Sequence, residues 1–254
     1  TDHIDLAEAE RRGIEILSLK TEYDLVDRVT CTAELAWGLL LAAVRRIPWA
    51  FRAAGEGRWA RDAFRGRQLA GKTLGIIGLG RLGRMVAEYG RAFRMRVLAT
   101  DVRPVEAPGV EVVDLDALLG LSDVISLHIH LTEENQGFID AEKLARMRDG
   151  VVLVNTSRGA VIDEAALLAA LESGKVAAAG VDVIEGEWRE DLADHPLILY
   201  ARQHENLVIT PHIGSATLEA QRMTLAFTAA PSTHKNKLAW KSRCVSNSPT
   251  ELIV

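Results

Sequence analysis

The chain has 254 residues, of which 48% are hydrophobic and 26% are charged, a composition typical of a globular protein that forms one large domain or two smaller ones. Its formal net charge is −5, which argues against a nucleic acid or a membrane surface as the main partner.

The cysteines and the apolar runs indicate in which cellular compartment the protein is expected. Cys31 and Cys244 are the only cysteines, and a pair so far apart supports neither a disulfide framework nor a zinc site. Residues 1–5 are polar and do not resemble a signal peptide, and the longest apolar run, 35–44, is too short to cross a bilayer. We therefore expect a cytoplasmic protein without a metal centre.

The first thirty residues do not make a complete domain. Residues 6–12 have the pattern of a short helix ended by Gly13, and residues 14–19 alternate like a strand. Since one helix and one strand cannot bury a core, we expect residues 1–30 either to pack on something else or to belong to a domain whose earlier part is absent from this chain.

Residues 32–46 are predicted to form a buried helix. Thr32 can cap its start, Pro48 is expected to stop it, and apolar side chains lie nearly all round it. Residues 49–64 then place tryptophans and phenylalanines among arginines. This segment is either a surface arm or a dimer contact, and we favour an arm that reaches a partner subunit.

The most specific pattern begins at residue 73. An apolar strand at 73–77 is followed by Gly-Leu-Gly-Arg-Leu-Gly at 78–83, an amphipathic helix, and a strand at 96–100 that ends in Asp101. An isolated glycine-rich turn would be weak evidence. Strand, glycine turn, helix, strand and acid in this order predict a dinucleotide-binding unit.

Each glycine of this turn has a mechanical task in such a unit. Gly78 permits the tight turn, Gly80 lets a pyrophosphate approach the backbone, and Gly83 lets the helix pack close to the sheet. Asp101, 18 residues beyond Gly83, would accept hydrogen bonds from the ribose hydroxyls and repel a 2′-phosphate. NAD is therefore favoured over NADP, although Arg103 nearby weakens that preference.

Strands and helices alternate through the rest of the chain. Strands are predicted at 110–113, 124–128, 151–155, 176–183 and 207–210, and helices at 115–119, 140–147, 163–173 (capped by Asp163 and stopped by Gly174) and 217–229. Alternation of this kind predicts an α/β fold with a doubly wound parallel sheet, the Rossmann arrangement.

Ligands of such sheets bind beyond the carboxyl ends of the strands. The polar residues expected there are Gly78, Asp101, His128, residues 156–159, Asp182 and residues 211–212.

Three of these positions suggest chemistry. Arg158 at a strand end could grip a carboxylate, although a solvated loop arginine is the alternative. His212 is the candidate proton donor and acceptor, against the commoner role of a loop histidine bonded to backbone. A carboxylate paired with His212 would raise its pKa, and periodicity leaves Glu185 and Glu187 both open. The remaining histidines are assigned to the structural role: His3, His130, His195, His204 and His234.

The runs 71–101, 155–159, 181–183 and 210–214 resemble the D-isomer-specific 2-hydroxyacid dehydrogenases, and the similarity extends over residues 1–229. The resemblance implies an Arg–Glu–His catalytic set at Arg158, Glu187 and His212, which selects Glu187 over Glu185. Trp188 replaces the proline that follows this glutamate in the family.

The resemblance also implies how NAD is held. Asp182 would meet the nicotinamide carboxamide, Arg81 and Leu82 would offer backbone N–H groups to the pyrophosphate, and Ile129 and Thr156 would line the cleft. The full expected cofactor site is Gly78, Gly80, Arg81, Leu82, Gly83, Asp101, Ile129, Thr156, Asp182, His212 and Gly214.

Family members are mostly homodimers joined through the cofactor domain and the helix at 32–46. By this resemblance, residues 1–30 are the end of a flavodoxin-like substrate domain and 31–230 are the NAD-binding domain. Residues 231–254, polar and basic, depart from the family as an irregular tail, and His130 stands where the family has proline.

Three functional hypotheses remain open at this point. The first is an NAD-dependent enzyme that interconverts a D-2-hydroxy acid and its 2-keto acid. The second is a truncated NAD-binding module without turnover, and the third is an NAD-sensing binding protein of the same fold. The substrate stays open among glyoxylate, hydroxypyruvate, phosphohydroxypyruvate and longer 2-keto acids.

Overall fold

The computed structural model describes residues 5–14 and 26–229, in two compact units that are considered separately. Residues 30–214 form one unit. The other comprises the flanking segments, in which the structure describes α1 (Leu6–Arg11) and α10 (Leu218–Ala229). Both helices are predicted by the sequence, whereas the strand expected at 14–19 falls almost wholly outside the described residues.

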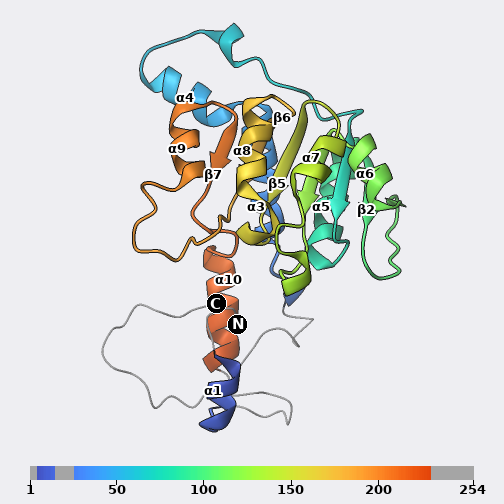
Figure 1. The fold of residues 1–254 in the computed structure, drawn as a ribbon, viewed down its shortest axis with the longest axis vertical. Helices are drawn as coiled ribbons and strands as arrows, with labels where there is room; N and C mark the ends of the chain where they lie inside the picture. Colours follow the sequence, from blue (N-terminus) through green and yellow to red (C-terminus); the bar gives the residue numbers. More distant parts are fainter. Residues whose placement is uncertain (1–4, 15–25, 230–254) are drawn as a thin grey trace. The chain divides into compact units, whose positions relative to one another are not determined.

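The larger unit is built on a seven-stranded sheet in which every described pair of strands is parallel. Its order is β3-β2-β1-β4-β5-β6-β7, which confirms the predicted doubly wound α/β fold (Figure 1). The strands are β1 (Thr73–Ile77), β2 (Arg96–Thr100), β3 (Glu111–Val112), β4 (Val124–Leu127), β5 (Val151–Asn155), β6 (Val176–Val181) and β7 (Leu207–Ile209).

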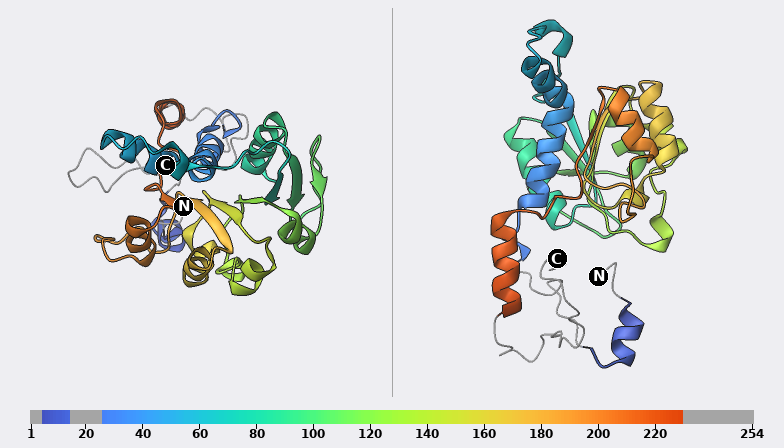
Figure 2. Two further views of the ribbon diagram at one scale, coloured as in Figure 1. Left: turned by 90° about the horizontal axis from the view of Figure 1, so that it is seen from above. Right: turned by 90° about the vertical axis from the view of Figure 1, so that its left-hand side faces the viewer.

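Helices cover both faces of this sheet, and each face has its own core. One face carries α3 (Cys31–Val44) and α5 (Arg81–Ala92), whose buried side chains cluster with those of β1, β2 and β5. The other carries α6 (Leu115–Leu121), α7 (Ala141–Arg146), α8 (Glu164–Glu172) and α9 (Pro196–Gln203). Figure 2 shows α3 on one side of the strands and α8 and α9 on the other.

The boundaries of α3 differ from the sequence prediction. The helix begins at Cys31, so Thr30 rather than Thr32 occupies the N-cap position. It ends at Val44, and the chain turns at Arg46, whose φ of 55° is left-handed. Pro48 does not stop α3; it lies in the first turn of α4 (Ile47–Gly55). Backbone N–H groups in the first turn of a helix have no carbonyl partner within the helix, so proline is tolerated there.

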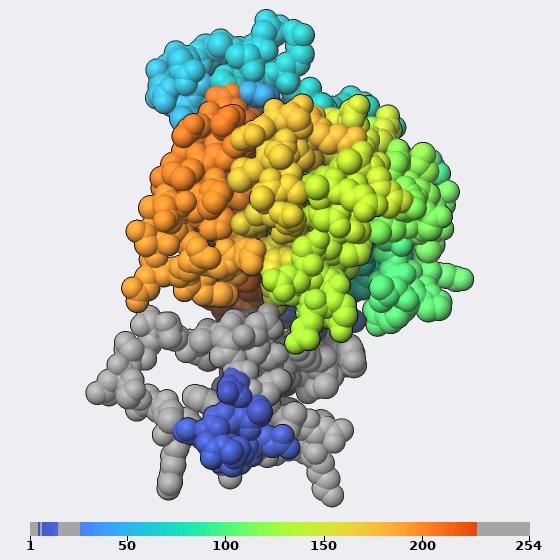
Figure 3. All heavy atoms as spheres, in the orientation of Figure 1, coloured from blue at the N-terminus to red at the C-terminus, as the bar shows by residue number. Residues whose placement is uncertain are grey.

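The segment predicted as an arm is partly packed and partly exposed. Trp49 and Ala53 of α4 are buried, whereas Phe51 is 79% exposed and Trp59 88% exposed. A short 3₁₀ turn, η2 (Arg61–Phe64), follows before the chain enters β1. In the space-filling view of Figure 3 this segment projects beyond the sheet and its covering helices.

Within the described parts of the chain, every helix is too short or too polar to reach across a lipid bilayer.

The β1–α5 connection depends on glycine. A Cβ atom at Gly83 would overlap the carbonyl oxygen of Gly78 and press on Ile76. Gly78 itself has a φ of +94°, and a Cβ there would meet the backbone of His128. A side chain at either position would force the start of α5 away from the strand.

We expect Gly83→Ala to destabilise the protein by about 1–3 kcal/mol, because the added methyl has no room. Gly120→Ala in α6 is the matched control, since no atom lies within 4 Å of its added Cβ. That change should instead stabilise the helix by about 0.5–1 kcal/mol. Denaturant unfolding followed by circular dichroism measures both, and a Gly83→Ala variant as stable as the parent would contradict the close packing.

Candidate active site

The segments that follow the strands meet at one edge of the sheet, because all strands point the same way. The glycine turn follows β1, Asp101 follows β2, and Arg158 lies beyond β5. Asp182 follows β6 directly, and His212 lies beyond β7. Residues distant in the sequence thus contribute to one site.

The glycine turn and Asp101 form a single hydrogen-bonded unit. The Asp101 carboxylate accepts the N–H of Leu79 at 2.9 Å and that of Arg103 at 3.0 Å. The Arg103 guanidinium lies 3.6 Å from the same carboxylate. Asp101 is therefore fixed at the turn, where the ribose of a bound dinucleotide would come.

The residues present fit a dinucleotide. The Cβ position of Gly80 has no atom within 4 Å, so the backbone is open to a pyrophosphate at the N-terminus of α5, which begins with Arg81 and Leu82. Ile129 lies beside Gly78. Thr156 is buried, and its hydroxyl has no partner among the described residues, as expected of a group that awaits a ligand. The individual cofactor contacts stay predictions.

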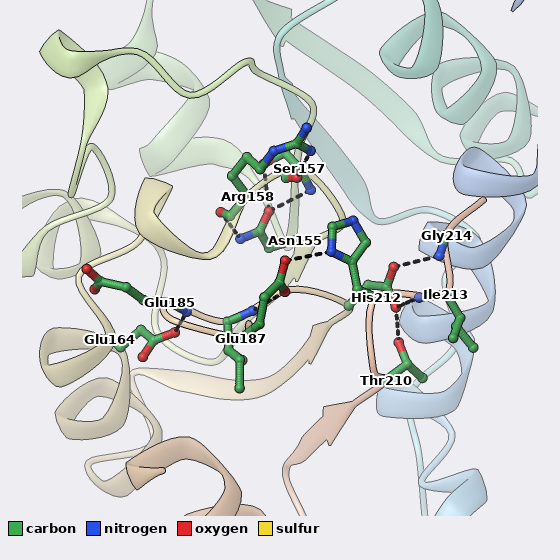
Figure 4. Close-up of polar contacts among 12 residues, drawn as sticks. Asn155, Ser157, Arg158, Glu164, Glu185, Glu187, Thr210, His212, Ile213 and Gly214 are labelled. Carbon is green, nitrogen blue, oxygen red and sulfur yellow. Dashed lines mark hydrogen bonds and ion pairs between the residues drawn. The ribbon is translucent and has the colours of Figure 1, made fainter. Parts of the chain in front are cut away.

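His212 and Glu187 form a hydrogen-bonded pair. Nδ1 of His212 lies 2.6 Å from Oε1 of Glu187, and Oε2 of Glu187 accepts the N–H of Ile184 at 3.3 Å (Figure 4). Of the two glutamates that the pattern left open, Glu187 is the one that contacts the histidine. Its side chain is 14% exposed and that of His212 is 33% exposed, which leaves the imidazole accessible to a substrate.

The surroundings of His212 favour its protonated form. The hydrogen bond that His212 donates to Glu187 is the main cause that raises its pKa above 6.5, and the charge of Asp182 acts in the same direction. Partial burial and the positive charge of Arg158 oppose the rise without cancelling it. The ring therefore keeps its proton to higher pH than an isolated histidine.

The turn that carries His212 is held by the buried carboxylate of Asp182. Its Oδ1 accepts from the Thr210 hydroxyl at 2.6 Å and from the Ile213 N–H at 2.9 Å, and its Oδ2 accepts from the Gly214 N–H at 2.8 Å. These bonds stabilise a backbone in which His212 has a left-handed φ of 53°. About one of the roughly four acceptor positions of the carboxylate remains for a nicotinamide carboxamide.

Arg158 lies on a turn organised by Asn155. The Asn155 side chain donates to the Arg158 carbonyl at 2.9 Å and accepts both the N–H and the hydroxyl of Ser157, at 3.0 and 2.7 Å. Asn155 is 1% exposed, so this turn is anchored in the core. This role of Asn155 is not predicted by the sequence, in which only a polar side chain at the end of an apolar strand could have indicated it.

Three further histidines among the described residues make contacts within the fold: His128, His204 and His195. His128 bonds Ser126 through Nε2 at 2.8 Å, and burial lowers its pKa to about 4. His204 bonds the Tyr200 carbonyl and stacks on that ring. His195 is buried and also bonds backbone, at the carbonyl of Glu185.

A pocket of about 500 Å³ adjoins the pair, lined by α4, α9, β7 and the two separate segments that carry Glu187 and His212. The Trp188 ring lies 5.6 Å from the His212 ring at the pocket wall. Trp188 is 72% exposed, so its indole forms an apolar boundary of the pocket next to His212.

A glycine turn suited to a dinucleotide and a hydrogen-bonded histidine–glutamate pair at one sheet edge are the arrangement expected of a nicotinamide-dependent oxidoreductase. Comparison with known proteins narrows this class. Residues 37–214 match the family model described as D-isomer specific 2-hydroxyacid dehydrogenase, NAD binding domain.

Individual relatives agree with that match. The chain is 45% identical over 222 residues to a hydroxypyruvate reductase of Thermotoga maritima, with 87% of this chain and 70% of the relative covered. It is 44% identical over 224 residues to a D-3-phosphoglycerate dehydrogenase of Archaeoglobus fulgidus, with 87% and 40% covered. A D-lactate dehydrogenase of Aquifex aeolicus, complexed with NAD and lactic acid, superposes with a TM-score of 0.78 at 34% identity, with 90% of this chain and 71% of that chain covered.

This chain belongs to the D-isomer-specific 2-hydroxyacid dehydrogenase family and contains its NAD-binding domain. It spans 70% of the length of the reductase and 40% of the length of the phosphoglycerate dehydrogenase.

Replacing Glu187 by glutamine keeps the size of the side chain and removes its charge. We expect the His212 pKa to fall toward 6.5, because the Glu187 hydrogen bond is the largest contribution to its rise. An NMR titration of the His212 ring measures this, with the exposed Glu190→Gln as control. An unchanged pKa in Glu187→Gln would mean that the pair is not formed in solution.

Proposed function

We propose that the protein is a cytoplasmic enzyme that interconverts a D-2-hydroxy acid and the corresponding 2-keto acid with NAD. The observation that carries the proposal is the His212–Glu187 pair, 2.6 Å apart, on the sheet edge that also bears Arg158 and the glycine turn. A group that moves protons is thereby combined with a cation suited to a carboxylate.

The residues would divide the chemistry as follows. Arg158 binds the substrate carboxylate through its guanidinium and orients the C2 carbonyl. Since Nδ1 of His212 bonds Glu187, Nε2 is the nitrogen that gives a proton to the carbonyl oxygen in reduction and removes it in oxidation. Glu187 fixes the ring and keeps it protonated near neutral pH. NAD, when bound, carries the hydride exchanged with C2.

The substrate class rests on this arrangement and on the names of relatives. A hydroxypyruvate reductase and a D-3-phosphoglycerate dehydrogenase are similar over most of this chain. Small 2-keto acids with a free carboxylate are therefore the substrates to test first: glyoxylate, hydroxypyruvate and phosphohydroxypyruvate.

We expect NADH to bind and to be oxidised when one of these keto acids is added, as followed by fluorescence and absorbance. His212→Gln should lower kcat/KM by about 10²–10⁴-fold, because general acid catalysis is lost. Arg158→Lys should mainly raise KM, because the bidentate grip on the carboxylate is lost. His204→Gln, outside the site, is the matched control.

Two results would contradict the proposal. NADH binding without turnover of any 2-keto acid would leave a cofactor-binding module. A failure of NADH to bind, with Asp101 and the three glycines of the turn intact, would remove its basis.

We further propose that the chain forms a homodimer through α3 and residues 47–64. The support is the exposure of Phe51 and Trp59 on a segment that projects from the sheet domain. Sedimentation equilibrium should give twice the chain mass, and Phe51→Ser with Trp59→Ser should weaken the association. Leu121→Ser, an exposed leucine elsewhere, is the control; a monomer at all concentrations would contradict the proposal.

A further inference from the structure

Two ionisable side chains outside the proposed catalytic set, one buried and one partly buried, contact the loop that carries Glu187. Glu164 is the first residue of α8, and its side chain is 15% exposed. His195 is the N-cap residue of α9, and its side chain is 5% exposed. They come from different helices, and their side chains approach to 3.3 Å.

These side chains hold both polar groups of one backbone residue. Oε1 of Glu164 accepts the N–H of Glu185 at 2.7 Å, and Nε2 of His195 lies 3.1 Å from the carbonyl oxygen of Glu185 (Figure 4 shows the first bond). Glu185 itself is exposed and makes no contact with His212 in the described structure. Glu164 and His195 therefore contact the backbone of Glu185 and not its side chain.

The tautomer of His195 follows from its neighbours. Nε2 faces two acceptors, the Glu185 carbonyl and the Glu164 carboxylate. Nδ1 is buried and has no partner among the described residues. A proton on Nδ1 would be buried and unsatisfied, so the ring carries it on Nε2, where it donates toward Glu185.

Gly159 makes a third contact with the same backbone. A Cβ atom at Gly159 would overlap the carbonyl carbon of Ile184 and the nitrogen of Glu185. The peptide between those two residues is therefore pressed against the residue that follows Arg158. The N–H of Ile184 in turn donates to the Glu187 carboxylate.

We propose that Glu164 and His195 are positioning residues for the acid–base pair: by fixing the backbone of Glu185 they set where the Glu187 carboxylate meets His212. Glu187 lies two residues beyond the held position, so a shift of that backbone is transmitted to its carboxylate. A misplacement of about 1 Å at a catalytic group can reduce the rate about 100-fold. The inference rests on the proposed function.

The groups around the Glu164 carboxylate include the ones that it contacts at Glu185 and His195. Burial raises the pKa of Glu164, and the Glu185 N–H, His195 and Arg189 oppose that rise. Glu185 is the nearby like charge.

The test compares Glu164→Ala, Glu164→Gln and His195→Ala with the parent. Glu164→Ala and His195→Ala should lower kcat by about 10–100-fold, while KM and the Kd of NADH change less than about twofold. Glu164→Gln keeps an acceptor for the Glu185 N–H and should therefore have a higher kcat than Glu164→Ala. Glu172→Gln, at the exposed end of the same helix, is the matched control.

The second readout does not depend on turnover. In an NMR titration, the His212 pKa should move from its raised value toward 6.5 in Glu164→Ala and His195→Ala, because the Glu187 contact is displaced. If the parent turns over no keto acid, the proposed function fails, but this comparison still decides the positioning role. Variants that fold and keep both the raised His212 pKa and the parental kcat would overturn the inference, even if their melting temperature falls. If the alanine variants do not fold, Glu164→Asp, whose shorter side chain withdraws the acceptor from the Glu185 N–H, gives the same decision.

Discussion

Parallel pairing of the strands is the constraint on which the site depends. Each strand must be followed by a return crossing before the next, so the segments after β1, β5, β6 and β7 all reach the same edge. Gly78, Arg158 and His212 therefore lie at one edge of the sheet although they are far apart in the sequence. The fold brings the chemistry together, and local hydrogen bonds then decide its detail.

The same kind of hydrogen bond shapes the turns at three strand ends. Asp101 after β2, Asn155 at the end of β5 and Asp182 after β6 each accept backbone N–H groups of a neighbouring turn. A polar side chain at the edge of the core thus shapes the turn that carries the functional group. The reactive side chains are aimed by a fixed backbone, which lowers the freedom that substrate binding must remove.

The sequence predicts most of the sheet because its signals are local. The bounds of β1, β2 and β5 agree with the apolar runs between glycine or polar residues. Local signals fail where they are ambiguous: threonine occurs at both 30 and 32, and Pro48 fits the start of a helix as well as its end. The contacts of Glu164 and His195 with Glu185 join separate elements, and no pattern in the sequence marks them.

The partial burial of His128 has a consequence for the stability of the protein in acid. Its pKa of about 4 in the folded state lies below the ordinary value of 6.5, so unfolding takes up a proton between these values. Stability is therefore lost as the pH falls from about 6.5 to about 4. His212, whose pKa is raised, acts in the opposite sense: its contribution is present below pH 6.5 and is lost as the pH rises through its folded value. Acidification thus weakens the fold through His128, while His212 stays protonated.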